Sequence, residues 1–96
     1  MIRLNYCSDG FPGKLKNQIM DDMVKGFKSE KTYLWAVSKF LVDRLETDGH
    51  GIWNCEIKPL DLQPGSYCPS KFYISLKFPY KGREYEAYLA KITPDQ

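Results

Sequence analysis

The sequence has no apolar run that approaches the roughly 18 residues needed to cross a bilayer, so it predicts no membrane-spanning helix. It also lacks an Asn-x-Ser/Thr acceptor and a recognisable secretory signal. Its three cysteines form no Cys-x-x-Cys pair, and an odd count leaves at least one thiol free in any monomer. We interpret this combination as typical of a reduced, intracellular chain that does not insert into a membrane.

An excess of one charge is also missing. The formal net charge is only +2, and Lys and Arg alternate with Asp and Glu along the whole chain without a basic block. A nucleic-acid-binding surface would gather its cations on one stripe or patch. The charge pattern therefore favours an ordinary solvated surface and predicts no nucleic-acid partner.

Side chains for catalysis or metal binding are few. A cysteine hydrolase needs a histidine beside its thiol, and the only imidazole is His50, between two glycines. We interpret His50 as a solvated loop residue and Cys55 as a small apolar residue beside Trp53. The single histidine and three scattered cysteines of this chain are too few and too far apart in sequence to predict a metal site. We therefore expect a protein that is not an enzyme and that holds no cofactor or metal.

One segment, from Arg44 to Cys55, contains Asp48-Gly49 followed by an apolar residue, as a calcium-binding EF-hand loop does. If Gly49 takes the sixth loop position, Arg44 takes the first and Cys55 the twelfth. An EF-hand places Asp at the first position and a bidentate Glu at the twelfth. The segment therefore predicts no calcium site.

Two amphipathic helices are expected in the N-terminal half, after a short strand over residues 2–7. Pro12 can open the first helix, whose apolar positions recur at helical spacing: Leu15, Ile19, Met20, Met23, Val24 and Phe27. Ser29 is the expected N-cap of the second helix, and Gly49 the expected left-handed residue at its end. The second apolar stripe comprises Leu34, Val37, Phe40, Leu41 and Leu45, with Trp35 away from its centre.

The C-terminal half is expected to be strands: residues 52–57, a short segment Gly65–Cys68 stopped by Pro69, and a hairpin of residues 72–78 and 85–92. The expected order is β-α-α-β-β-β-β in a single α+β domain over residues 1–96, with both helices on one face of an antiparallel sheet. The last strand is apolar on both of its faces, because Tyr88 and Leu89 point in opposite directions. A sheet face that its own helices do not cover is normally polar. We therefore expect a second copy to cover it, as a sheet-to-sheet homodimer.

Three short motifs, in this order of elements, resemble a known family. Glu30-Lys31, Trp53-Asn54-Cys55 and Gly65-Ser66-Tyr67 are similar to segments of the cytoplasmic dynein light chains of the eight-kilodalton class, and the resemblance runs from Ile2 to Ile92. The chain is also similar to the dynein-light-chain-like domains that follow EF-hands in fluke tegumental calcium-binding, allergen-like proteins.

The resemblance implies a homodimer in which the Gly-Ser-Tyr strand crosses to the partner's sheet and short peptides add a further strand to it. Carried over by position, the peptide-binding residues would be Gly65, Ser66, Tyr67, Cys68, Phe72, Ile74, Glu30 and Lys31. The dimer interface would include Trp53, Cys55, Tyr67 and Tyr88.

The implied partners are a second copy and short linear peptides of other proteins, with dynein intermediate chain as one candidate, in a cytoplasmic, cytoskeleton-associated setting. An alternative is the dimerisation domain of a tegumental EF-hand protein with a degenerate peptide groove. Two residues depart from the family. Asn54 replaces a histidine that makes the family's dimer acid-sensitive, and Pro69, which has no N–H, is expected to shorten the edge that a peptide can use.

Overall fold

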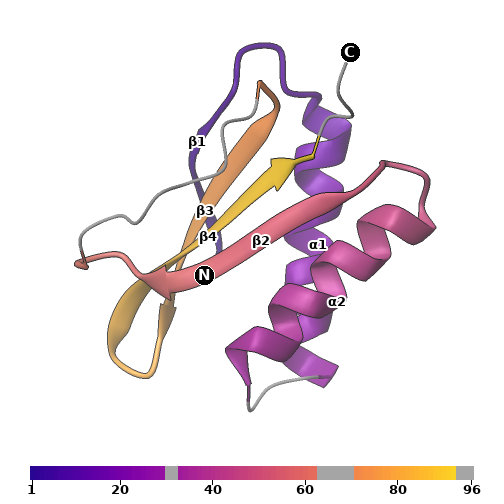
Figure 1. Cartoon of the computed structure of the whole chain (residues 1–96). Helices are drawn as coiled ribbons and strands as arrows, with labels where there is room; N and C mark the ends of the chain where they lie inside the picture. The colour runs from indigo at the N-terminus through magenta and orange to yellow at the C-terminus, as the bar shows by residue number, and fades with distance from the viewer. Residues whose placement is uncertain (30–32, 63–70, 93–96) are drawn as a thin grey trace.

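The computed structural model describes residues 1–29, 33–62 and 71–92. Its elements are β1 (Arg3–Cys7), α1 (Gly13–Ser29), α2 (Leu34–Thr47), β2 (Trp53–Pro59), β3 (Tyr73–Tyr80) and β4 (Arg83–Lys91). The four strands form one antiparallel sheet in the order β1-β3-β4-β2. Both helices lie on the same side of this sheet (Figure 1). The α+β architecture is confirmed, whereas the strand expected over Gly65–Cys68 lies outside the described residues.

A single core joins the helices to the sheet. Its buried members come from both apolar stripes and from the inward-facing strand positions: Leu15, Ile19, Met23, Val37, Leu41, Leu45, Trp53, Ile74, Leu76, Phe78, Ala87 and Leu89. The helical spacing thus predicted the correct faces of both helices. Val24 is an exception, because it lies at the margin of its stripe and is 43% exposed.

Gly26 is the point of close approach between the helices. A Cβ atom built at this position would lie 3.1 Å from the Phe40 ring and 3.3 Å from the Val37 side chain. Nearby, the buried Asp22 accepts a bond from Arg44 of α2, at 3.4 Å between Oδ1 and Nη2. Besides the shared apolar core, the helices therefore meet through the small Gly26 and through the Asp22–Arg44 ion pair.

The predicted start of the second helix is wrong. Ser29 is the last residue of α1, and its hydroxyl donates to the carbonyls of Lys25 and Gly26 at 3.1 and 3.4 Å. Helix α2 instead follows Tyr33, whose side chain makes no capping bond. A serine hydroxyl can bond its own preceding turn as readily as it can cap the next helix, and the sequence pattern does not distinguish the two.

The predicted end of α2 is confirmed. Gly49 has a φ of +83°, the left-handed conformation that a residue just past a helix often adopts. Its N–H donates to the Glu46 carbonyl at 3.1 Å, and the His50 N–H donates to the Leu45 carbonyl at 2.9 Å. These two bonds form a Schellman motif, which turns the chain from α2 into β2.

We predict that Gly26→Val lowers the free energy of unfolding by about 1–3 kcal/mol, because the added methyl groups would overlap Phe40 and Val37. Gly13→Val is the matched control, since a Cβ at this first residue of α1 meets nothing within 4 Å. Urea unfolding followed by circular dichroism measures both variants. Equal destabilisation by the two substitutions would contradict the close approach at Gly26.

Candidate interaction site

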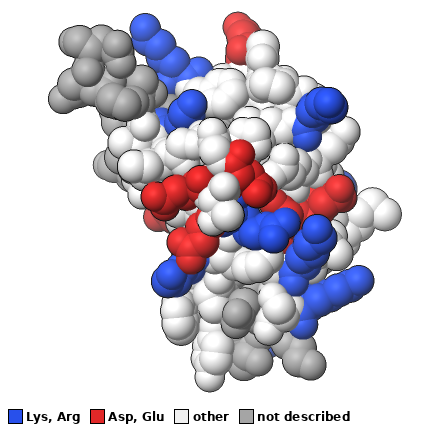
Figure 2. All heavy atoms as spheres, turned by 90° about the vertical axis from the view of Figure 1, so that its right-hand side faces the viewer, with Lys and Arg blue, Asp and Glu red and all other residues white. Residues whose placement is uncertain are grey.

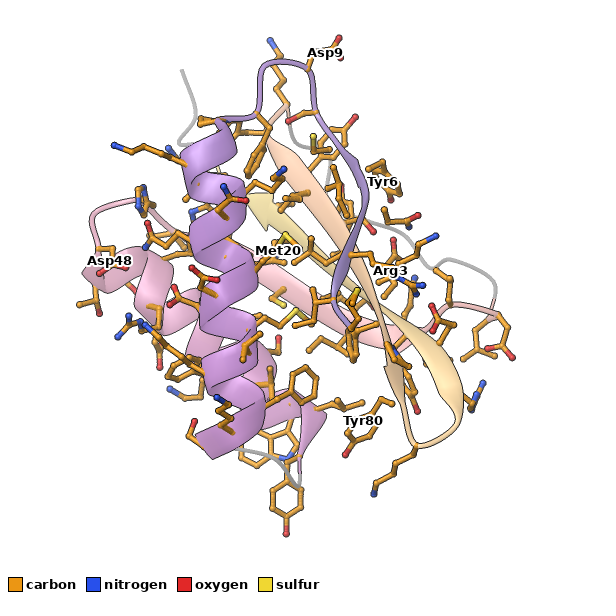
Figure 3. The ribbon with its side chains drawn as sticks, turned by 180° about the vertical axis from the view of Figure 1, so that it is seen from behind. Arg3, Tyr6, Asp9, Met20, Asp48 and Tyr80 are labelled. Carbon is orange, nitrogen blue, oxygen red and sulfur yellow. The ribbon has the colours of Figure 1, made fainter. Side chains whose placement is uncertain are left out.

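The side of the sheet opposite the helices, here called the outer face, carries a cluster of tyrosines. The ring centroids of Tyr6 and Tyr73 lie 6.2 Å apart in a T-shaped arrangement, and those of Tyr73 and Tyr88 lie 6.0 Å apart and stacked. Tyr6 remains 41% exposed, whereas Tyr88 is buried. Figure 3 shows Tyr6 projecting from β1 away from α1. The prediction that the last strand is apolar on both faces is therefore confirmed.

A buried carboxylate lies within this cluster. Glu86 is 5% exposed, and its Oε2 accepts bonds from Ser75 Oγ at 2.6 Å and from the Tyr6 hydroxyl at 3.4 Å. Asn5 Nδ2 donates to Ser75 Oγ at 3.2 Å, and Lys58 is the register partner of Glu86 on β2. The sequence pattern did not predict this network. Glu86 alternates onto the same face of β4 as Tyr88, and this was the sequence feature that could have predicted its place in the network.

The outer edge of β2 is open within the described part of the chain. In an antiparallel ladder, alternate residues turn their N–H and C=O groups toward the neighbouring strand. Ile52 and Leu60 bond to β4, because the Ile92 N–H donates to the Ile52 carbonyl and the Leu60 N–H donates to the Glu84 carbonyl, both at 2.8 Å. The residues of odd number between them therefore face away from β4, and β2 is the last strand of the sheet.

One group on this edge already has a partner. Ser38 Oγ on α2 donates to the Cys55 carbonyl at 2.7 Å. The bond confirms that the Cys55 carbonyl points out of the sheet, toward the flank of α2. Trp53 and Ile57 have the same orientation on either side of Cys55, so their backbone groups line the rest of the edge.

Two of the predicted dimer-interface residues do not lie on the outer face. Trp53 is 2% exposed in the core of the single chain, and its indole N–H donates to the His50 carbonyl at 2.9 Å. Cys55 is half-buried against the same core. Their side chains therefore cannot provide a sheet-to-sheet interface. Tyr88 does lie on the outer face, and Tyr67 falls outside the described residues.

The predicted groove floor needs a similar correction. Ile74 has no exposed surface and packs in the core, so it cannot contact a peptide in this conformation. Phe72 is half-buried and stacks on Phe11, with 4.7 Å between ring centroids. The remaining residues assigned to the groove lie outside the described residues: Gly65, Ser66, Tyr67, Cys68, Glu30 and Lys31.

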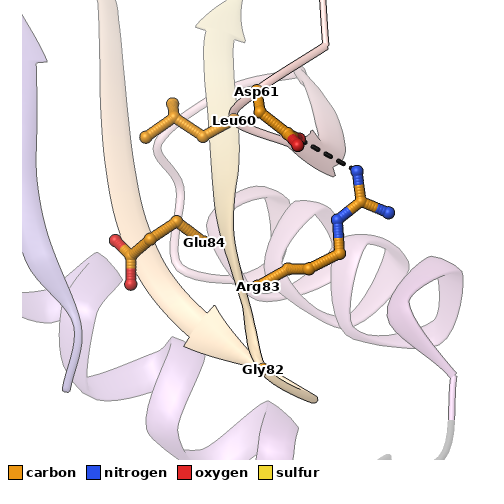
Figure 4. Close-up of a pocket in the computed structure, with 5 residues that line it drawn as sticks. All are labelled: Leu60, Asp61, Gly82, Arg83 and Glu84. Atoms are coloured by element: carbon orange, nitrogen blue, oxygen red, sulfur yellow. Dashed lines mark hydrogen bonds and ion pairs between the residues drawn. The ribbon is translucent and has the colours of Figure 1, made fainter.

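A shallow hollow of about 440 Å³ lies beside the β3–β4 hairpin, lined by Leu60, Asp61, Gly82, Arg83 and Glu84 (Figure 4). Arg83 Nη2 donates to Asp61 Oδ1 at 2.9 Å, and this bond lowers the pKa of the Asp61 carboxyl. Both side chains are well exposed. The hollow therefore presents an ordinary surface ion pair rather than a perturbed, desolvated acid of the kind found in active sites.

Charges are mixed elsewhere on the surface. Figure 2 shows acidic and basic side chains intermingled on the side where α2 lies. Across residues 1–29, 33–62 and 71–92, no three His, Cys, Asp or Glu side chains are grouped so that they could hold a metal ion. In the same ranges, neither helix is both long and apolar enough to cross a membrane.

Comparison with known proteins gives a likeness in structure only. No protein-family model matches the chain, and no curated protein matches it. The solved dynein light chain-like domain of the Fasciola hepatica calcium binding protein FhCaBP2 is similar, with a TM-score of 0.67 and 11% sequence identity over 97% of this chain and 92% of that one. A mercury derivative of that domain gives a TM-score of 0.64 and 12% identity, over 98% and 93% of the two chains. The chain therefore has a dynein light chain-like fold.

We predict that the Cys55 thiol resists alkylation in the folded protein. Burial raises its pKa to about 12, so at pH 8 its thiolate fraction is about 1,000-fold below that of an unperturbed cysteine. The same shift lowers the free energy of unfolding as the pH rises from about 9 toward 12, because only the unfolded thiol ionises there. Peptide mass spectrometry after iodoacetamide treatment, with and without denaturant, measures the protection. Rapid labelling of Cys55 without denaturant would contradict it.

Proposed function

We propose that this chain is a non-catalytic, dimeric protein-interaction module that binds short extended peptides by strand addition. The observation that carries the proposal is the open edge of β2, which presents backbone groups in the regular spacing of a strand, so that a strand of a second copy can add to it and a peptide can add to that strand. The dynein light chain-like fold supports it, since the similar domains cover nearly the whole of this chain.

The outer face supports association with a second copy. Tyr6 donates to the buried Glu86 and packs on Tyr73 and Tyr88, and both helices lie on the other side of the sheet. Aromatic residues are enriched at protein interfaces because a large ring buries much area and its hydroxyl can still form a hydrogen bond. A symmetric copy would bring two such clusters together around the two-fold axis.

The edge of β2 supports strand addition. Each new backbone hydrogen bond contributes roughly 0.5–1.5 kcal/mol net, so a few of them together with side-chain packing give measurable affinity. In the proposed dimer, the Gly65–Cys68 segment of each copy pairs with the partner's sheet, and the peptide adds to the outer side of that segment. Glu30, Lys31 and Phe72 remain the candidates for contacts at its margin.

The proposed ligands are short linear peptides of partner proteins, and the proposed setting is the cytoplasm, in association with the microtubule motor system. Dynein intermediate chain is one candidate partner. These assignments rest on the family resemblance of the sequence and on the fold.

A second candidate function is dimerisation within a larger calcium-binding protein, without peptide binding. The similar solved domains belong to a protein described as calcium binding, and this favours it. This chain would not bind the calcium itself through residues 44–55, because Arg44 lies in α2 and Cys55 in β2, which leaves no 12-residue loop between two helices.

We predict that Tyr6→Glu weakens self-association at least about tenfold, because it places a second carboxylate beside Glu86 in a surface that a partner would cover. Val24→Glu is the matched control: Val24 on α1 has a similar exposed fraction, 43%, and lies away from the sheet. Sedimentation equilibrium measures the dimer dissociation constant of each variant. A wild-type chain that stays monomeric at roughly 100 µM, where a micromolar dimer would be almost fully formed, would remove the dimer proposal.

We also predict that the wild-type dimer binds members of a library of short extended peptides. Tyr6→Glu, at concentrations at which it is monomeric, should bind none, since the peptide site requires strands of both copies. Fluorescence anisotropy of the retained peptides gives their affinities. If the dimer forms and retains no peptide, dimerisation within a larger protein becomes the better description.

A further inference from the structure

A second hollow, of about 430 Å³, lies where the start of α1 meets the turn that follows α2. Its lining residues are Pro12, Lys14, Leu15, Gln18 and His50. The Gln18 side-chain amide donates to Asp48 Oδ2 at 2.6 Å, and Figure 3 shows Asp48 beside α1. This bond joins the two segments that form the hollow. The hollow lies at the helices and is therefore separate from the outer face of the sheet.

The backbone of His50 is fixed on both sides. Its N–H donates to the Leu45 carbonyl at 2.9 Å, and its carbonyl accepts from the Trp53 indole at 2.9 Å. The next residue, Gly51, has a φ of +92°, and a Cβ there would lie 2.8 Å from Lys91 Cε. The half-buried His50 imidazole itself makes no hydrogen bond with any described residue. The fold therefore holds a polar ring at the hollow with its two nitrogens available.

Lys14 supplies a positive charge at the same hollow. It is exposed and forms no ion pair within residues 1–29, 33–62 and 71–92. Of the described residues that line the hollow, none is acidic. Asp48 already accepts from Gln18, and Asp21 follows Lys14 by seven residues, about 10 Å along the helix axis. That distance exceeds the Debye length of about 8 Å at physiological salt, so the local charge favours an anion.

The remaining lining residues, Pro12 and Leu15, are apolar. Leu15 is 7% exposed and belongs to the core, so packed apolar side chains lie behind the hollow. Small-molecule sites usually combine an apolar lining with a few polar groups and have volumes of roughly 300–1,000 Å³. The hollow meets both conditions.

We propose that this hollow binds a small organic anion, a carboxylate on a compact apolar body. Lys14 would pair with the carboxylate, and a His50 imidazole N–H would donate to it. The apolar body would lie against Pro12 and Leu15. Gln18 is a positioning residue, because its bond to the turn keeps His50 beside α1. The site needs no second copy and no peptide, so it does not depend on the proposed function.

Three probes separate the parts of this inference. Phenylacetate carries both the charge and the apolar body, phenylacetamide keeps the shape without the charge, and acetate keeps the charge without the ring. In amide NMR titrations of the full chain, phenylacetate should shift the signals of Lys14, Leu15, Gln18 and His50 with one dissociation constant. A value of about 1 mM is expected for a ligand of about ten heavy atoms. Phenylacetamide and acetate should each bind at least about fivefold more weakly.

Substitutions test the assigned roles. Lys14→Gln should weaken phenylacetate binding about tenfold, because it removes the charge-assisted hydrogen bond. His50→Gln should weaken it about threefold, since a neutral donor is replaced by a less well placed one. Lys28→Gln is the matched control: it removes the same charge from the last turn of the same helix and should leave the constant unchanged. Thermal unfolding of each variant separates a loss of folding from a loss of binding.

Three results would overturn the inference. The first is no saturable shift of these four amides at about 20 times the expected dissociation constant. The second is a wild-type chain that binds phenylacetamide or acetate as tightly as phenylacetate. The third is equal weakening by Lys14→Gln and Lys28→Gln, which would indicate a general effect of net charge. None of these results would affect the proposals of dimerisation and peptide binding.

Discussion

The register of β2 on β4 governs how this molecule can meet another chain. It sets Trp53 opposite Lys91 and Glu56 opposite Tyr88, and it is maintained by the packing of Trp53 in the core and by its indole bond to the His50 carbonyl. A shift by one residue would move every side chain of β2 to the opposite face. It would also turn the Cys55 carbonyl inward, away from Ser38. The register of β2 on β4 therefore determines both which side chains lie on the outer face and which backbone groups point out from the edge.

The outer face combines aromatic area with a buried carboxylate. Glu86 has hydrogen-bond donors from Ser75 and Tyr6 within the single chain, so much of the cost of its burial is already offset before any partner arrives. A purely apolar partner surface would gain area from the tyrosines but would remove remaining water from the carboxylate. A second copy carries the same hydrogen-bond donors and aromatic rings, so it could cover this surface with both apolar area and polar groups.

The sequence predicted the parts of the fold that depend on periodicity. Helical spacing identified the buried stripes of α1 and α2, and strand alternation identified two apolar faces of β4. Alternation cannot say which apolar face the helices cover, so it gave no check on the dimer-interface residues Trp53 and Cys55, which the family resemblance implied and which pack in or against the core. Ile74, which the resemblance implied for the groove, is buried in the core as well.

Other features depended on pairing between distant segments. Glycine is favourable at position 26 because the Phe40 ring of the other helix leaves little room for a side chain there. Asp22 is buried where Arg44 of α2 pairs with it. Ser38 had no apparent role in the sequence, because its significance comes from the Cys55 carbonyl opposite it. The resemblance to dynein light chains correctly implied the fold, whereas the site residues carried over from it fell partly in the core and partly outside the described residues.

Amide hydrogen exchange on β2, measured by NMR at low and high protein concentration, tests the central claim most directly. The N–H groups of Asn54, Glu56 and Lys58 face β4 and should exchange slowly at both concentrations. The N–H groups of Cys55 and Ile57 face the open edge and should become protected only as the dimer forms. Fast exchange of Cys55 and Ile57 at every concentration, with β4-facing amides still protected, would contradict association through this edge.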